Sequence, residues 1–127
     1  MARGIHAELV ADEFLEHATQ EQQHVDMIAR RITQLNGAPN FNPDGMTARS
    51  HTEYVECKTL HEMIRENLVA ERIAIETYTE MVRYLGNSDP TTRRMVEDIL
   101  KQEEEHADDL SRILSAHEGS QEARQIA

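Results

Sequence analysis

The fold is decided by residues 96–117, VEDILKQEEEHADDLSRILSAH, where apolar and ionisable residues follow one helical stripe. The stripe advances in alternating steps of three and four residues, which indicates one face of an α-helix packed against a core. Its members, in order, are Val96, Ile99, Glu103, His106, Leu110, Ile113 and His117. Glu103 and His106 therefore occupy positions where core side chains are expected.

A second Glu-x-x-His pair, Glu21 and His24, lies in the corresponding stripe near the N-terminus. That stripe reads Phe14, His17, Glu21, His24, Ile28 and Leu35. Residues three apart on a helix share a face, so each pair can present a carboxylate oxygen and an imidazole nitrogen to one metal cluster. His17 and His117 are interpreted as structural groups or as supports for metal ligands.

The stripe between these two carries a single acid at a core position, Glu71. It reads Ile64, Leu68, Glu71, Ile75, Tyr78, Val82 and Leu85. Tyr78, two turns after Glu71, is expected to pack in the core. The sequence thus predicts that three carboxylates and two imidazoles point into one core.

The predominance of helix-forming residues predicts an all-α fold within a single domain over 1–127. Apolar periodicity and capping signals place its helices at about 7–36, 59–85 and 89–117. Glycine follows each predicted helix, at the position that favours a left-handed cap. The segment 37–58 is long for a connection between antiparallel neighbours, so we expect a crossover that leaves its flanking helices parallel. Residues 118–127 are predicted to form a tail.

The composition favours cations as ligands and disfavours nucleic acid. The chain has 127 residues, with 24 acidic and 13 basic side chains and a formal net charge of -11. Phosphate binding needs clustered Lys and Arg, which this balance does not supply. A lone cysteine, Cys57, cannot form an internal disulfide, and no apolar stretch is long enough for a membrane span, so a cytoplasmic location is expected.

A metal centre is the favoured interpretation of the five inward-pointing groups. Burial of an unpaired carboxylate costs roughly several kcal/mol, so a positively charged group or ion must offset its charge. Oxygen and nitrogen donors without thiolate favour iron or manganese over structural zinc. Two alternatives stay open: the stripe is exposed to solvent, or a polar network neutralises the acids through Arg31, Arg65 or Arg72.

The order Glu-x-x-His, lone Glu, Glu-x-x-His on successive helices resembles the ferritin-like superfamily, in which such residues hold two metals. The stretches 29–40, 67–71 and 99–109 resemble bacterioferritins in particular. The resemblance implies a ferritin-like helical bundle that oxidises Fe(II) with O2 or H2O2 and stores iron as a homo-oligomer. It also implies a di-iron site. Neither nucleic acid nor a membrane is expected as a partner, because of the acidic balance and the lack of a long apolar stretch.

The resemblance implies a role for each residue of the pattern. Glu21 and Glu103 would bridge the two irons, Glu71 and His106 would complete one iron, and His24 would bind the other. The three glutamates would thereby be both metal ligands and catalytic residues. Haem is not expected, because bacterioferritins bind it through a methionine where this chain has Gln22.

The sequence also departs from the family pattern. Residues 1–5 resemble only the end of the family's first helix, so one carboxylate ligand and one quarter of the bundle lack counterparts. Either a partner chain covers the resulting apolar groove by pairing or swapping, or the recorded start lies downstream of the true one, and oxidation would be impaired by the missing carboxylate. The alternative functions are a non-catalytic helical assembly subunit with one metal or none, and a stress protein of the mini-ferritin type, which the acidic balance disfavours.

Overall fold

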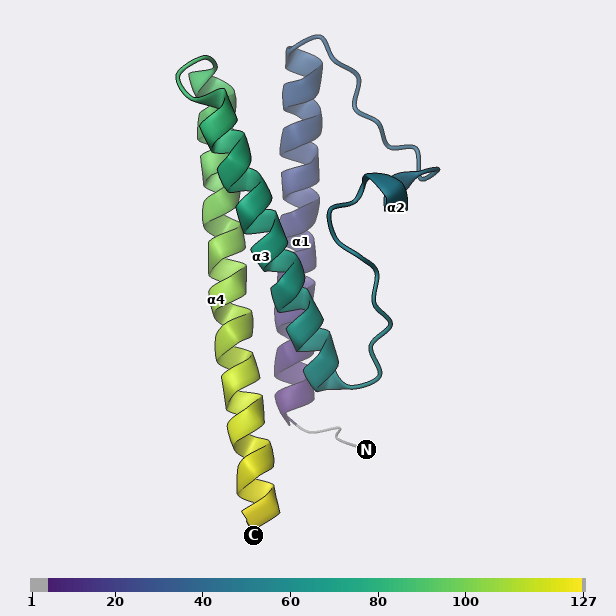
Figure 1. Cartoon of the computed structure of the whole chain (residues 1–127), viewed down its shortest axis with the longest axis vertical. Helices are drawn as coiled ribbons and strands as arrows, with labels where there is room; N and C mark the ends of the chain where they lie inside the picture. The colour runs from purple at the N-terminus through teal and green to yellow at the C-terminus, as the bar shows by residue number, and fades with distance from the viewer. Residues whose placement is uncertain (1–4, 127) are drawn as a thin grey trace. The chain divides into compact units, whose positions relative to one another are not determined.

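The computed structural model describes residues 5–126, which form four α-helices and contain no strand (Figure 1). The helices are α1 (Ile5–Gln34), α2 (Met46–Arg49), α3 (Leu60–Leu85) and α4 (Pro90–Ile126). The predicted all-α class is confirmed. The chain consists of two compact units, Met1–Glu53 with α1 and α2, and Tyr54–Ala127 with α3 and α4. No helix within the described residues has the length and apolar character needed to cross a bilayer.

The start of α3 is held by reciprocal capping, as the sequence predicts. The Glu62 backbone N–H donates to Thr59 Oγ1 at 3.1 Å, and the Lys58 backbone N–H donates to the Glu62 carboxylate at 2.8 Å. These bonds satisfy N–H groups around the helix start that would otherwise have no intrahelical acceptor. The helix ends at Gly86, which has a φ of 49° and donates its N–H to Val82 O at 3.1 Å.

A tight turn leads from α3 into α4, and the two helices pack against each other as an antiparallel pair (Figure 1). Asp89 caps α4 by accepting from the Thr92 backbone N–H at 3.0 Å, and Arg93 donates to Gly86 O at 3.0 Å. The core of this unit consists of five side chains that are at most 5% exposed: Ile64, Leu68, Val96, Ile99 and Leu110. All five belong to the predicted stripes.

The predicted end of the third helix near His117 is wrong, because α4 continues through Gly119 to Ile126. Gly119 does not have a positive φ, and a Cβ built on it would meet nothing within 4 Å. Glycine in a helix interior costs only about 1 kcal/mol relative to alanine, so it does not by itself end a helix. The Ser120 hydroxyl donates to Ala116 O at 2.9 Å, across the glycine. The predicted tail is therefore helical.

In the first unit, α1 ends close to the predicted boundary, but a different residue takes the left-handed conformation. Asn36 has a φ of 64°, while Gly37 donates its N–H to Ile32 O at 2.8 Å. Asparagine tolerates this conformation better than most residues, because its short polar side chain can bond locally. The predicted end of the helix is therefore nearly correct, since α1 ends at Gln34.

The long connection after α1 contains a four-residue helix, α2, that the periodicity did not predict. Side-chain turns order the chain ahead of it: Asn40 Oδ1 accepts from the Asn42 N–H, and Asn42 Oδ1 accepts from the Asp44 N–H, both at 3.0 Å. Gly45 follows with a φ of 75°. Asparagine and aspartate favour such local bonds, which replace helix or sheet hydrogen bonding.

Candidate metal centre

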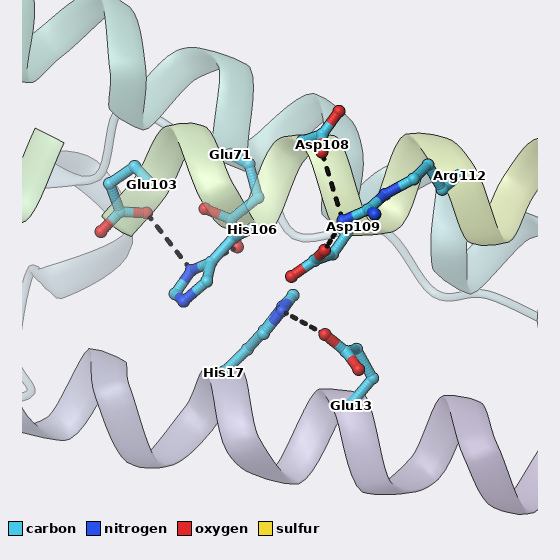
Figure 2. A network of polar contacts seen from close by, with 8 residues as sticks. All are labelled: Glu13, His17, Glu71, Glu103, His106, Asp108, Asp109 and Arg112. Carbon is cyan, nitrogen blue, oxygen red and sulfur yellow. Dashed lines mark hydrogen bonds and ion pairs between the residues drawn. The ribbon is translucent and has the colours of Figure 1, made fainter. Parts of the chain in front are cut away.

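One carboxylate of α3 and a Glu-x-x-His pair of α4 converge within the second unit (Figure 2). His106 Nδ1 lies 3.5 Å from Glu71 Oε1 and 3.9 Å from Glu103 Oε2. One ligand atom from each residue lies within 4.8 Å of those of the other two. The three side chains are thus close enough for one cation to draw them together.

The helical stripe explains why these side chains are buried. Along α4 the buried residues are Val96, Ile99, Glu103, His106 and Leu110, in the predicted steps of three and four. The side chains of Glu103 and His106 are 1% and 3% exposed, and that of Glu71 is 13% exposed. Glu104 and Glu105, adjacent in sequence, are exposed. Position in the stripe therefore distinguishes the candidate ligands from solvated acids, and the solvent-exposed alternative is excluded for this group.

The arginine alternative is weakened on α3. Arg65 and Arg72 are both exposed, although each lies within six residues of Glu71. Glu71 instead lies against His106, and histidine is itself a common metal ligand. Two carboxylates and an imidazole held in a buried position have the donor chemistry of a hard or borderline divalent cation.

The pair on α1 lies in the first unit. His24 is 1% exposed, and its Nδ1 is 3.6 Å from Glu21 Oε2, whose side chain is 46% exposed. The two side chains therefore share a helix face, as their spacing predicts. Because Glu21 and His24 belong to a different unit from the other three residues, their union with those residues stays a prediction.

His17 has a partner that the sequence analysis missed. Its Nε2 lies 3.2 Å from Glu13 Oε1, one turn earlier on α1 (Figure 2). His17 is 6% exposed, so the stripe position that marked it as inward is confirmed. The spacing of four residues between Glu13 and His17 was the available signal, and Glu13 lies outside the stripe on which the sequence analysis concentrated.

Tyr78 and Cys57, also singled out in the sequence analysis, are not among the proposed ligands. Tyr78 is half-buried on α3. Partial burial, and then the carboxylates of Glu66 and Glu62, raise the pKa of the Cys57 thiol above its usual value. A raised pKa lowers the thiolate fraction, and thiolate is the form that binds metals. Cys57 also lies outside the groups of described residues that could hold a metal ion.

A sequence model of the ferritin-like domain matches residues 1–119. The chain belongs to the ferritin-like family. The resemblance predicted from the Glu-x-x-His order is thereby confirmed, and the match extends across α1, α3 and most of α4. The buried group on α3 and α4 is accordingly a candidate centre in a ferritin-like protein.

Similarity to a solved structure supports the same assignment. The structure is that of a dodecameric thioferritin, the bacterioferritin-related protein from Bacteroides fragilis. It is 31% identical to this ferritin-like chain, with a TM-score of 0.87, and the match covers 94% of this chain and 72% of that one. Among curated proteins, none matches. The ferritin-like fold is therefore shown by both sequence and structure.

Proposed function

We propose that this ferritin-like protein binds iron at a carboxylate-bridged di-iron centre, oxidises Fe(II), and stores or detoxifies the ferric product as a homo-oligomer. The proposed ligands are Glu21, His24, Glu71, Glu103 and His106. The observation that carries the proposal is the buried group of Glu71, Glu103 and His106 on α3 and α4. A cytoplasmic location and the absence of haem belong to the same proposal.

The chemistry of the buried group favours iron. A carboxylate removed from water loses its hydration, and a bound cation restores the lost electrostatic stabilisation. Glu71 and Glu103 supply hard oxygen donors, and His106 supplies a borderline nitrogen donor. Carboxylate and imidazole donors without sulfur suit Fe(II) and Mn(II), whereas structural Zn(II) sites usually include cysteine thiolates.

The burial of the two glutamates supports different roles for them. Glu103, with a 1% exposed side chain, is more enclosed than Glu71, at 13%. A bridging carboxylate uses both oxygens on two ions and needs a central position, which the family resemblance assigns to Glu103. Glu71 would then be a terminal ligand of the iron that His106 also binds.

The proposed reaction balances with iron as the substrate. Two Fe(II) ions lose one electron each, and O2 takes up both electrons with two protons to give H2O2. With H2O2 as oxidant, the same two electrons and two protons give two molecules of water. Bridged metals can deliver both electrons to one oxidant, and the carboxylates stabilise the greater charge of the ferric product.

Assembly into a homo-oligomer is proposed from the similarity to a dodecameric protein. The described residues also expose large apolar side chains on α1 and α3, including Leu9, Leu15, Met63 and Val69. Contact with another subunit would remove such apolar side chains from water. Sedimentation velocity on the purified chain tests this part of the proposal, and a single monomeric species at micromolar concentration would contradict it.

Anaerobic Fe(II) titration tests the centre itself. The natural chain should bind two Fe(II) per subunit and oxidise them when O2 is admitted. Glu103→Ala should lose binding at both positions, because it removes the proposed bridge, whereas Glu71→Ala should weaken mainly one. Glu104→Ala is the matched control, since Glu104 is the exposed neighbour on α4.

Two results would contradict the proposal. Equal losses from Glu71→Ala and Glu103→Ala would remove the distinction between terminal and bridging roles. Absence of Fe(II) binding to the natural chain, with its helical fold intact, would favour the alternative of a non-catalytic assembly subunit.

A further inference from the structure

A second histidine cluster lies in the unit formed by α3 and α4, near the first turn of α3. The rings of His61 on α3 and His117 on α4 are stacked, with centroids 5.9 Å apart and planes inclined by 29°. His61 Nε2 lies 3.8 Å from Glu118 Oε1, also on α4. Two imidazoles and a carboxylate from two helices are thus gathered outside the proposed iron centre.

The cluster is well separated from the iron centre along both helices. His61 precedes Glu71 by ten residues, and His117 follows His106 by eleven. At 1.5 Å per helical residue, each interval corresponds to about 15 Å. No ligand of the iron centre can therefore be shared with the cluster.

The surroundings of His61 leave one ring nitrogen suited to bind a cation. The Glu118 carboxylate faces Nε2 and favours the tautomer that carries hydrogen there. In that tautomer Nδ1 keeps its lone pair. His61 Nδ1 is buried and has no hydrogen-bond partner among residues 5–126, so no protein group engages its electron pair. A carboxylate behind a ligating histidine is a recurrent arrangement in metal sites.

We propose that His61 and His117 bind a divalent transition-metal ion, of which Zn²⁺ is the best fit, with Glu118 orienting His61. Zn–N distances of about 2.0–2.1 Å place two coordinating rings with centroids roughly 5–6 Å apart. The observed 5.9 Å is within that range, although the stacked rings must rotate so that one nitrogen of each points at the ion. Water would complete the coordination, because His61 and His117 are each partly exposed.

His117 also has a partner that the ion must accommodate. Gln121 Nε2 lies 3.0 Å from His117 Nε2, one turn further along α4. The amide nitrogen is a donor, which leaves hydrogen on His117 Nδ1 when no metal is bound. Binding therefore displaces the Gln121 side chain or changes the tautomer of His117. Gln121 is exposed and flexible enough to move without disturbing the core.

The negative charge of Glu118 offsets one unfavourable feature of this location. His61 lies in the first turn of α3, where the positive end of the helix dipole disfavours a cation. The Glu62 carboxylate in the same turn counteracts that dipole, although it also caps the Lys58 N–H. The ion thus bridges the start of α3 and the distal part of α4, and its binding should stabilise the pairing of these segments.

Calorimetric titration with Zn²⁺ tests the site in the full-length Glu103→Leu variant, which removes the proposed bridging ligand of the iron centre. That background separates the two proposals, since failure of the iron centre leaves the result unaffected. Saturable binding of one Zn²⁺ per subunit is expected. His61→Asn and His117→Asn should each weaken it by more than about tenfold, because loss of even an outer-shell partner costs about 10–100-fold.

The controls decide between a site and incidental binding. His51→Asn removes an exposed histidine of the crossover and should leave Zn²⁺ affinity unchanged. Glu118→Gln, at an exposed position that cannot threaten the fold, should cause a smaller loss than either histidine variant. Unchanged affinity in His61→Asn or His117→Asn, or an equal loss in His51→Asn, would overturn the proposal, as would the absence of Zn²⁺ binding in the Glu103→Leu background.

Discussion

The middle of α4 and its last turns differ in what makes them helical. Residues 96–110 contribute three buried apolar side chains, together with Glu103 and His106, to the contact with α3. From Glu118 to Ile126 nearly every residue is exposed, and Ile126 is 89% exposed. Tertiary packing stabilises the first region, while the second depends on local backbone hydrogen bonds and propensity.

The comparison also shows where ionisable residues can acquire a function. In the middle of α4, the stripe encloses Glu103 and His106, and enclosure gives a carboxylate a reason to bind a cation. In the last turns, Glu118 and Glu122 are exposed, so there is no cost of a buried charge for a cation to offset. His117 is at the border between the two regions, where a partly exposed imidazole still meets α3 through His61.

The largest expected effect comes from removing core volume in the middle of α4. Ile99→Ala should destabilise the protein by about 2–5 kcal/mol, because Ile99 is 1% exposed and its loss leaves a cavity. Chemical denaturation at one fixed protein concentration measures the change. Ile126→Ala is the matched control at the exposed end and should fall within about 0.5 kcal/mol of the natural chain. Similar losses for the two variants would remove the contrast between the regions.

A smaller effect of opposite sign is expected when the enclosed carboxylate becomes apolar. Glu103→Leu should leave the metal-free protein as stable as the natural chain, or more stable by about 1–4 kcal/mol, because the cost of burying charge disappears. The same variant should lose the rise in Tm that Fe(II) gives to the natural chain. Glu104→Leu, one residue away and exposed, should do neither. A strong loss of metal-free stability in Glu103→Leu would show that the carboxylate has a structural role.

The sequence predicted the packed parts of the molecule well because their stripes report tertiary contact. The buried side chains Ile64, Leu68, Val96, Ile99 and Leu110 all lie on predicted seam positions, as do Glu103 and His106. The four-residue helix α2 is too short to show a period of 3.6 residues, so no pattern predicted it. Gly86 ends α3 at the predicted position and has a positive φ, but its ψ of -123° places it outside the left-handed helical region that the prediction assigned to it.

The candidate site was predictable residue by residue and not as a whole. Periodicity places Glu71, Glu103 and His106 on inward faces, and the antiparallel turn brings α3 beside α4. Periodicity identifies the members of a stripe but not the side chains beside it that contact them. It therefore missed the contact between Glu13 and His17. Its joining of the α1 pair to the α3 and α4 group still depends on the family resemblance and awaits the metal titrations.

The smallest expected effect comes from Gly119, the glycine at which the sequence analysis predicts the end of the third helix. Gly119→Ala should raise the stability of α4 by up to about 1 kcal/mol, because alanine loses less backbone entropy in a helix and its Cβ meets no atom within 4 Å. Ala116→Gly, at an exposed position one turn earlier, should lose a similar amount. Gly86→Ala should also lose stability, since its φ of 49° strains an L-residue. Far-UV circular dichroism and thermal unfolding measure all three. If Gly119→Ala instead lowers the helix content, residue 119 adopts a left-handed cap in solution, and the last turns of α4 are not helical there.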